Sequence, residues 1–175
     1  AYYQALQAIF EGYTLSPQTN FMEELRMIKD EKELATIRKA CSISDRAFTD
    51  VLDFIKPGQT TELQVANFLD FRMREYGASG ISFESIIASG YRSAMPHGVA
   101  SDKIIQSGET LTMDFGCYYN HYVSDMTRTI HIGETTDEER EIYDIVLRSN
   151  RSLIDATKAG MTRRDYDKVA RDVIV

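Results

Sequence analysis

The chain has 175 residues, is 43% hydrophobic and carries a formal net charge of −7. This size predicts one domain with one substantial core, and the acidic balance argues against a nucleic-acid or anionic-membrane partner. No apolar stretch approaches the ~20 residues of a membrane span and no signal peptide opens the chain, so a cytoplasmic setting is expected. Cys41 and Cys117 lie far apart without a metal-binding spacing, which predicts free thiols, with Cys41 packed in a helix.

Helical spacing dominates the first part of the chain. Apolar residues recur at this spacing over residues 2–10, and Gly12 ends the helix. Residues 13–20 predict a strand or turn, and residues 21–28 a connecting segment. A long helix is then expected from Asp30 or Glu31 to about Ile55, with one apolar side and one charged side that faces solvent.

A second long helix follows a clear break at Pro57-Gly58. Thr60 or Thr61 caps it, and it runs to about Tyr76, where Gly77 closes it. Residues 81–89 predict a strand.

The helix-breaking pattern occurs twice. Lys56-Pro57-Gly58-Gln59-Thr60 is matched 102 residues further on by Lys158-Ala159-Gly160-Met161-Thr162, between helices expected over 137–157 and from 163 onward. This predicts an internal repeat of two helices followed by strands. The second copy stops at Val175, where its strands are expected, so the chain is interpreted as a piece of a longer one.

Residues 111–132 predict a β-hairpin. Two runs of alternating character meet at Asn120-His121, and both residue types tolerate the positive φ that a tight two-residue turn requires. The turn sets the register, in which Tyr119 faces Tyr122, Gly116 faces Asp125, and Asp114 faces Thr127.

This register places Asp114 and Asp125 on one face of the hairpin, roughly 7–8 Å apart at the backbone. Gly116 leaves a space beside them. Two carboxylates on one sheet face repel each other, so a cation is expected between them. The alternative is a solvent-facing side of the strands that carries two exposed charges.

Three segments resemble a known family. Asp-Phe-Gly at 114–116 with Ser-Asp-Met-Thr-Arg-Thr at 124–129 resembles the first half of the dinuclear metal site of the methionine aminopeptidase/prolidase/aminopeptidase P family. Residues 88–102 (ASGYRSAMPHGVASD) resemble that family's substrate-histidine segment. Residues 23–34 (EELRMIKDEKEL) resemble the linker that opens the catalytic domain in its Xaa-Pro-cleaving branch. The resemblance spans most of the chain.

The resemblance implies an α+β fold, the first part of a pita-bread (creatinase/aminopeptidase-like) domain with helices packed on a mainly antiparallel sheet. Residues 1–30 would be the tail of an N-terminal domain plus a linker. Residues 31–175 would form an incomplete catalytic domain, with the first repeat over 31–133 and the start of the second over 134–175.

The resemblance also implies the site. Asp114 would bind one metal ion with both oxygens, Asp125 would bridge two ions, and Thr127 would support the ligands with its hydroxyl. His97 matches the catalytic histidine that lies over the metals and holds the scissile peptide. Two divalent ions are expected, Mn²⁺ first, with Co²⁺ or Zn²⁺ as alternatives. The family's other ligands, one His and two Glu, are expected beyond Val175.

The remaining histidines match no functional position. His121 stands where a hairpin glycine is common, and His131 shares the odd-numbered face of Asp125. A turn role is assigned to His121 and a strand role to His131.

The expected function of the intact protein is metal-dependent cleavage of Xaa-Pro bonds in dipeptides or at peptide N-termini, with short proline-containing peptides as substrates. The chain as given is expected to be inactive, because two Asp cannot fill two coordination spheres. It is also expected to form a homodimer, since a sheet without its second set of strands has an unpaired edge. The alternatives are a methionine aminopeptidase, a non-catalytic pita-bread binding module and a metal-free, creatinase-like amidohydrolase.

Overall fold

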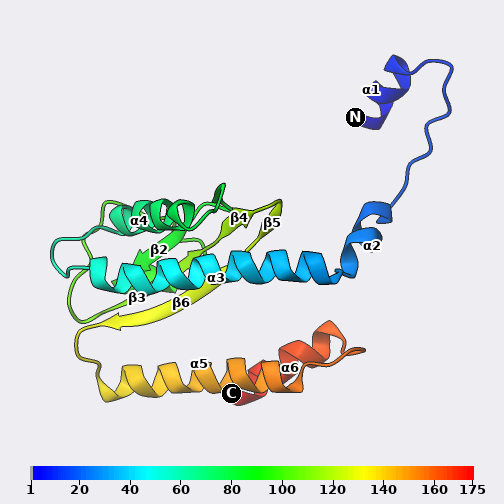
Figure 1. The fold of residues 1–175 in the computed structure, drawn as a ribbon. Helices are drawn as coiled ribbons and strands as arrows, with labels where there is room; N and C mark the ends of the chain where they lie inside the picture. The colour runs from blue at the N-terminus through cyan, green and yellow to red at the C-terminus, as the bar shows by residue number, and fades with distance from the viewer. Residues whose placement is uncertain (1) are drawn as a thin grey trace.

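The computed structural model describes residues 2–175, which form helices and short antiparallel strands (Figure 1). Helices α1 (Tyr2–Ile9) and α2 (Phe21–Met27) precede the pair α3 (Glu31–Phe54) and α4 (Glu62–Glu75). The strands follow as β1 (Gly80–Ile81), β2 (Ile86–Ser89), β3 (Glu109–Phe115), β4 (Cys117–Tyr119), β5 (Tyr122–Val123) and β6 (Met126–Ile132). The 3-10 helix η1 (Gly90–Ala94) lies between β2 and β3, and the chain ends with α5 (Asp137–Ala156) and α6 (Arg163–Ile174).

Helices α3 and α4 begin where their capping residues require. The Asp30 carboxylate accepts from the Glu33 backbone N–H at 2.8 Å, and the Glu33 carboxylate accepts from the Asp30 N–H at 2.7 Å. Thr61 and Gln64 form the same reciprocal pair at α4, so Thr61 is the cap. Both helices have the expected extents.

The buried side of α3 follows helical periodicity, with Ala40, Ile43, Ser44, Ala47 and Val51 inside. The prediction that Cys41 packs inside this helix is wrong, because the residue is exposed. It follows Ala40 by one position, about 100° around the helix axis, and this rotation carries it off the buried side. Both cysteines are free thiols, as expected.

The hairpin has the predicted turn and register. Asn120 and His121 have φ values of 46° and 70°, and Tyr119 pairs with Tyr122. Asp114 pairs with Thr127 in the continuation of the hairpin through β3 and β6. The strands form two three-stranded antiparallel sheets, in the orders β2-β3-β6 and β1-β4-β5. The strand expected over residues 81–89 is divided into β1 and β2, and the Ser82 N–H between them donates to the Gly116 carbonyl.

One face of the strands forms the core with α3 and α4. Residues Leu111, Met113, Phe115 and Cys117 of β3 and β4 are fully buried, while the intervening Thr112 and Asp114 are only half-buried. The core joins them to the buried sides of α3 and α4. The opposite face of β3 and β6, with Asp114 and Thr127, is therefore the face that α3 and α4 leave open.

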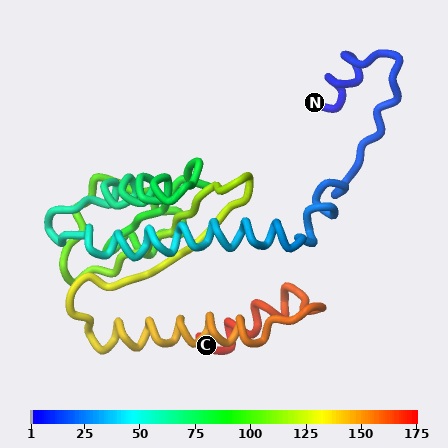
Figure 2. Tube along the Cα trace, viewed as in Figure 1, coloured from blue at the N-terminus to red at the C-terminus, as the bar shows by residue number. Residues whose placement is uncertain are grey.

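The two ends of the chain bury little. Helices α1 and α2 contribute no buried residue, and they extend away from α3 (Figures 1 and 2). Residues 21–27 form the short α2, where a connecting segment was expected. Helices α5 and α6 pack against each other, and the Ser149 hydroxyl joins them by donating to the Ala170 carbonyl at 2.9 Å. Within residues 2–175, no helix combines the length and apolar character that a bilayer span requires.

Candidate functional site

The hairpin positions two carboxylates on its open face. Asp114 is flanked in the sheet by Ile86 of β2 and Thr127 of β6, which fixes its backbone on both sides. Asp125 lies between the β4–β5 and β3–β6 pairings, next to Ser124. Ser124 donates its backbone N–H to the Cys117 carbonyl at 2.9 Å, so the predicted register continues through this segment. Asp114 is half-buried and Asp125 is exposed.

Neither carboxylate is paired with a cationic side chain in the described part of the chain. No Lys, Arg or His within residues 2–175 forms an ion pair with Asp114 or Asp125. The nearby Arg128 lies 4.0 Å from the Asp45 carboxylate of α3 instead. The Asp114 Oδ1 atom is buried and has no hydrogen-bond partner in the described part of the chain. This is an unusual state for a buried carboxylate oxygen, because burial without a partner costs free energy.

Gly116 allows the hairpin to close tightly beside these carboxylates. A Cβ atom at this position would lie 2.0 Å from the Ser124 carbonyl oxygen and 2.5 Å from the Ser82 hydroxyl. The space that the sequence indicated beside Asp114 is therefore filled by these two oxygen atoms. Glycine is required here for close approach of the backbone.

Ser124 anchors the strand immediately before Asp125, and sequence reasoning missed it. Its side-chain oxygen accepts from the Cys117 N–H at 2.9 Å and lies 2.6 Å from the Ser44 hydroxyl of α3. Its carbonyl accepts from the Ser82 hydroxyl at 2.9 Å. Because side chains alternate along a strand, the buried Ser124 directs Asp125 to the opposite, open face. A small polar residue before the second Asp was the only sequence signal for this anchor.

The tip of the hairpin is tied to the start of α3. The Tyr122 hydroxyl donates to the Glu33 carboxylate at 2.6 Å. This hydrogen bond, followed by the one from the Asp30 backbone, lowers the pKa of Glu33, while the same contact raises the pKa of Tyr122. The hairpin is thus held at its tip by Glu33 and in its middle by Ser44 of the same helix.

His97 lies in an exposed loop at the edge of the sheet. Val99, two residues later, forms an antiparallel bridge with Ile86, the strand partner of Asp114. The neighbouring Gly98 is buried, and a Cβ atom there would lie 3.0 Å from the Ala88 Cβ. The structure therefore brings the segment of His97 to the row of residues that contains Asp114. No hydrogen bond within residues 2–175 joins the His97 ring to either Asp.

Thr127 and the other histidines occupy their predicted elements. Thr127 is exposed and pairs with Asp114, and its hydroxyl makes no hydrogen bond in the described chain. His121 is the second turn residue. His131 lies in β6, where its Nε2 is 2.9 Å from the Glu134 carbonyl and its Nδ1 is 3.8 Å from Glu139.

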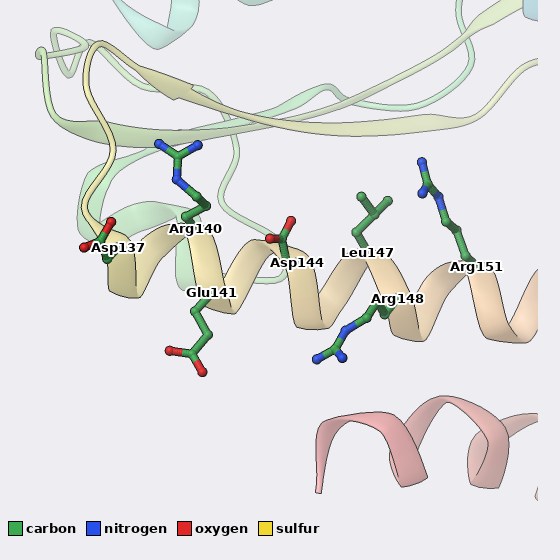
Figure 3. Close-up of a pocket in the computed structure, with 7 residues that line it drawn as sticks. All are labelled: Asp137, Arg140, Glu141, Asp144, Leu147, Arg148 and Arg151. Carbon is green, nitrogen blue, oxygen red and sulfur yellow. The ribbon is translucent and has the colours of Figure 1, made fainter.

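Two grooves lie along α5, and neither is lined by His97, Asp114, Asp125 or Thr127. One groove, of about 410 Å³, separates Thr129 and His131 of β6 from α5. Another, of about 570 Å³, follows α5 itself, where Arg140, Asp144, Leu147 and Arg151 point toward the strands (Figure 3). Glu141 and Arg148 point away from the strands (Figure 3). The candidate site is therefore identified by the arrangement of its carboxylates.

Most of the chain matches a known protein family. Residues 35–175 match metallopeptidase family M24. The chain is 44% identical over 153 residues to the Xaa-Pro dipeptidase of Pyrococcus furiosus, covering 87% of this chain and 44% of that protein.

The fold is similar to that of solved structures. The Xaa-Pro dipeptidase from Bacillus anthracis superposes with a TM-score of 0.92 at 45% identity, over 98% of this chain and 48% of that one. The X-Pro aminopeptidase from Thermotoga maritima superposes with a TM-score of 0.91 at 39% identity, over 98% and 49%. These likenesses confirm the expected α+β, pita-bread architecture. The chain spans about half the length of the relatives it matches.

Proposed function

Because the chain belongs to metallopeptidase family M24, we propose that the intact protein is a metal-dependent peptidase that cleaves Xaa-Pro bonds in dipeptides or at peptide N-termini. Relatives named Xaa-Pro dipeptidase support this substrate class. The observation that carries the proposal is the hairpin pairing, which brings Asp114 and Asp125 to one open face. No ion pair within residues 2–175 neutralises either carboxylate.

The two carboxylates fit a divalent cation. The Asp114 Oδ1 atom is buried and lacks a partner within the described residues, and a cation would balance it. Asp114 would hold one ion, and Asp125 would bridge to a second. Carboxylate oxygens suit Mn²⁺, which we place first, with Co²⁺ or Zn²⁺ as alternatives where a histidine joins the ligands. When bound, such a pair lowers the pKa of a shared water and polarises the peptide carbonyl.

Two carboxylates do not complete two coordination spheres. The described residues 2–175 contain no group of three or more His, Cys, Asp or Glu placed to hold a metal ion. We therefore assign the remaining ligands, one His and two Glu by resemblance, to sequence outside this chain. On this proposal, residues 1–175 alone bind metal weakly and show no appreciable peptidase activity.

His97 and Thr127 receive supporting roles. His97 would hold the scissile peptide of the substrate, because its segment is anchored beside Asp114 while its side chain is exposed and free of protein partners in the described chain. Thr127 would orient Asp114 with its hydroxyl, because the two residues are direct strand partners.

The domain limits follow from the same proposal. Residues 1–30 would connect an N-terminal domain to a catalytic domain that begins at residue 31. Residues 31–133 would form its first repeat, and residues 134–175 the start of its second. We also propose that the intact protein is a homodimer.

The decisive experiment uses the intact protein, stripped by a chelator and reloaded with Mn²⁺. An Xaa-Pro dipeptide, its Xaa-Ala analogue and a peptide with N-terminal Met and no proline are compared as substrates. Metal-dependent cleavage of the proline dipeptide is expected. Removal of Met alone would indicate a methionine aminopeptidase, and activity that survives the chelator would indicate a metal-free amidohydrolase. If none of the three substrates is cleaved, the alternative of a non-catalytic binding module would be supported.

A further inference from the structure

We propose that Glu62 is a positioning residue that holds the His97 loop, defined as residues 95–101, and acts on the reaction through His97. The inference rests on the proposed function, because it requires His97 to contact the substrate. Glu62 lies at the start of α4 and is fully buried. A buried carboxylate costs free energy unless it is paired and hydrogen-bonded, so its partners show what the protein gains from it.

Within residues 2–175, all the hydrogen-bond donors to the Glu62 carboxylate come from residues that flank His97. One carboxylate oxygen accepts from the backbone N–H and the hydroxyl of Ser89, at 2.7 and 2.9 Å. The other accepts from the Arg92 Nε at 3.0 Å and from the backbone N–H and hydroxyl of Ser101, at 3.2 and 2.6 Å. One side chain therefore joins the chain before His97 to the chain after it.

Arg92 extends this connection to the residue next to the loop's buried glycine. Its Nη2 donates to the Val99 carbonyl at 2.6 Å while its Nε contacts Glu62. The planar guanidinium supports both hydrogen bonds at once, which a lysine could not reproduce. Val99 in turn bridges to Ile86 beside Asp114. Glu62, Arg92 and Val99 thus form a chain of contacts from α4 to the strand row that contains the candidate metal ligand.

The backbone of Glu62 is itself fixed. The reciprocal pair of Thr61 and Gln64 sets the first turn of α4, and the backbone N–H groups of Glu62 and Leu63 donate to the carbonyls of Lys103 and Ser101. The carboxylate consequently projects from a rigid position toward a loop that has little core of its own. His97 is one of the residues of this loop that remain exposed, and its side chain accepts or donates no hydrogen bond within residues 2–175.

Replacing the Glu62 carboxylate by an amide would remove hydrogen bonds to the loop. Both oxygens of Glu62 accept from N–H groups, at Ser89 on one side and at Arg92 and Ser101 on the other. A glutamine has one carbonyl oxygen, so its NH₂ group would face N–H donors whichever way it is turned. Glu62→Gln should therefore loosen the loop while leaving side-chain volume nearly unchanged.

The test is a double-mutant cycle in the intact, metal-loaded protein with an Xaa-Pro dipeptide as substrate. Glu62→Gln is expected to lower kcat/KM about 10- to 100-fold, the effect of a displaced substrate-holding group. In the His97→Ala background, the same change should lower kcat/KM by less than about threefold, because the group it positions is already absent. Metal content should be unchanged in both variants. Equal losses in the two backgrounds would overturn the inference and leave Glu62 as a general stabilising residue.

A second readout does not depend on activity. The Gly98 N–H donates to the Met95 carbonyl at 3.2 Å and the Val99 N–H to the His97 carbonyl at 2.9 Å, so hydrogen exchange reports on the loop. Glu62→Gln should increase exchange at these amides about tenfold or more. Unchanged exchange would overturn the inference even in an active enzyme. An intact protein that cleaves no Xaa-Pro peptide but shows faster exchange would overturn the proposed function and leave the link between Glu62 and the loop standing.

Asp50→Asn is the matched control. Asp50 is another Arg-paired carboxylate of the same helix pair: it accepts from the Arg72 Nε at 2.8 Å and from the Tyr76 hydroxyl. Neither partner belongs to the His97 loop, so loop exchange and kcat/KM should change less than about twofold. If Glu62→Gln does not fold, Ser101→Ala removes only the 2.6 Å hydroxyl contact and should produce the same pattern with a smaller loss. Absence of any effect from Ser101→Ala would then count against the inference.

Discussion

The two helix pairs of this chain share their local sequence signals and differ in what they bury. Each of α3, α4, α5 and α6 begins with a reciprocal capping pair, and Gly58 and Gly160 have positive φ values of 76° and 89° in the two connections. Helices α3 and α4 nevertheless supply much of the core, whereas within residues 2–175 the α5–α6 pair buries Ser149 alone. Local signals determine where a helix begins, and a packed sheet face determines how much it stabilises the fold.

The candidate site residues lie on the part of the fold that packs against α3 and α4. Asp114 lies on β3 and Asp125 between β5 and β6, in a hairpin whose other face packs on α3, and His97 lies in a loop that α4 holds. The apolar side of α5 is exposed in this chain, including Ile142, Val146 and Ile154. The first helix pair with its strands is thus a packed support for the site.

The largest effect is expected at Asp125. In the intact protein, Asp125→Asn should abolish Mn²⁺-dependent cleavage of an Xaa-Pro dipeptide, because an amide does not replace the bridging carboxylate. The fold should persist, and thermal stability without metal should be equal or higher, since one of two repelling charges is removed. Activity assays and thermal melts measure both effects.

Asp144→Asn, an exposed carboxylate on α5, is the control and should retain activity. Retained activity in Asp125→Asn would refute the ligand assignment. Loss of activity in Asp144→Asn alone would place the chemistry with the second helix pair.

The next effect compares one isoleucine from each pair. Ile43 of α3 is 0% exposed and Ile142 of α5 is 55% exposed. Ile43→Ala should lower the free energy of unfolding of the 175-residue chain by about 2–5 kcal/mol, and Ile142→Ala by about 0.5 kcal/mol. Urea titrations followed by circular dichroism measure the difference. A larger cost for Ile142→Ala in the intact protein than in this chain would show that further sequence covers α5.

The sequence predicted the helices and the hairpin because its strongest signals are local. Helical periodicity located α3, a threonine cap located α4, and the repeated helix-breaking pattern located α5 and α6. The Asn120-His121 turn fixed the hairpin register by its required positive φ. Once the register is known, period-two alternation places Asp114 and Asp125 on the same face. The two candidate ligands were therefore found without tertiary information.

The contacts that hold the site were not predictable in the same way. Glu62 looked like an ordinary acidic residue in the first turn of a helix, and its burial depends on Ser89, Arg92 and Ser101 arriving from a distant loop. Ser124 likewise depends on Ser44 of α3. Neither contact could be read from a regular spacing in the sequence, because residues brought together by packing can lie at any distance along the chain.

A smaller effect is expected at the threonine caps of the second helix in each pair. Thr61→Ala should lower the free energy of global unfolding by about 1 kcal/mol, because α4 belongs to the core. Thr162→Ala should leave global unfolding unchanged and increase hydrogen exchange in the first turn of α6, which buries no described residue. Equal decreases in the free energy of global unfolding in both variants would show that α6 unfolds cooperatively with the core.

The smallest effect concerns acid at the other two caps, Glu33 of α3 and Glu139 of α5. The Tyr122 hydroxyl, and then the Asp30 backbone, lower the pKa of Glu33 from its ordinary value of 4.5, and the Thr136 backbone and hydroxyl lower that of Glu139. A carboxylate whose pKa is lower in the folded than in the unfolded state stabilises the fold at pH values above its unfolded-state pKa. This contribution is lost as the pH falls through the folded-state pKa.

Both helices should therefore weaken below a pH of about 4.5, by small amounts because both side chains are only half-buried and solvent screens their charges. Protonating Glu33 also weakens its link to Tyr122, so the tip of the hairpin should be affected with α3. Protonating Glu139 should affect α5 and its 3.8 Å contact with His131 of β6. Amide exchange measured from pH 6 to 3.5 in Glu33→Gln and Glu139→Gln separates the effects of the two carboxylates. The acid-dependent change at the amides of the hairpin tip, residues 119–122, should disappear only in Glu33→Gln, and its disappearance in Glu139→Gln would show that the two helix pairs are coupled.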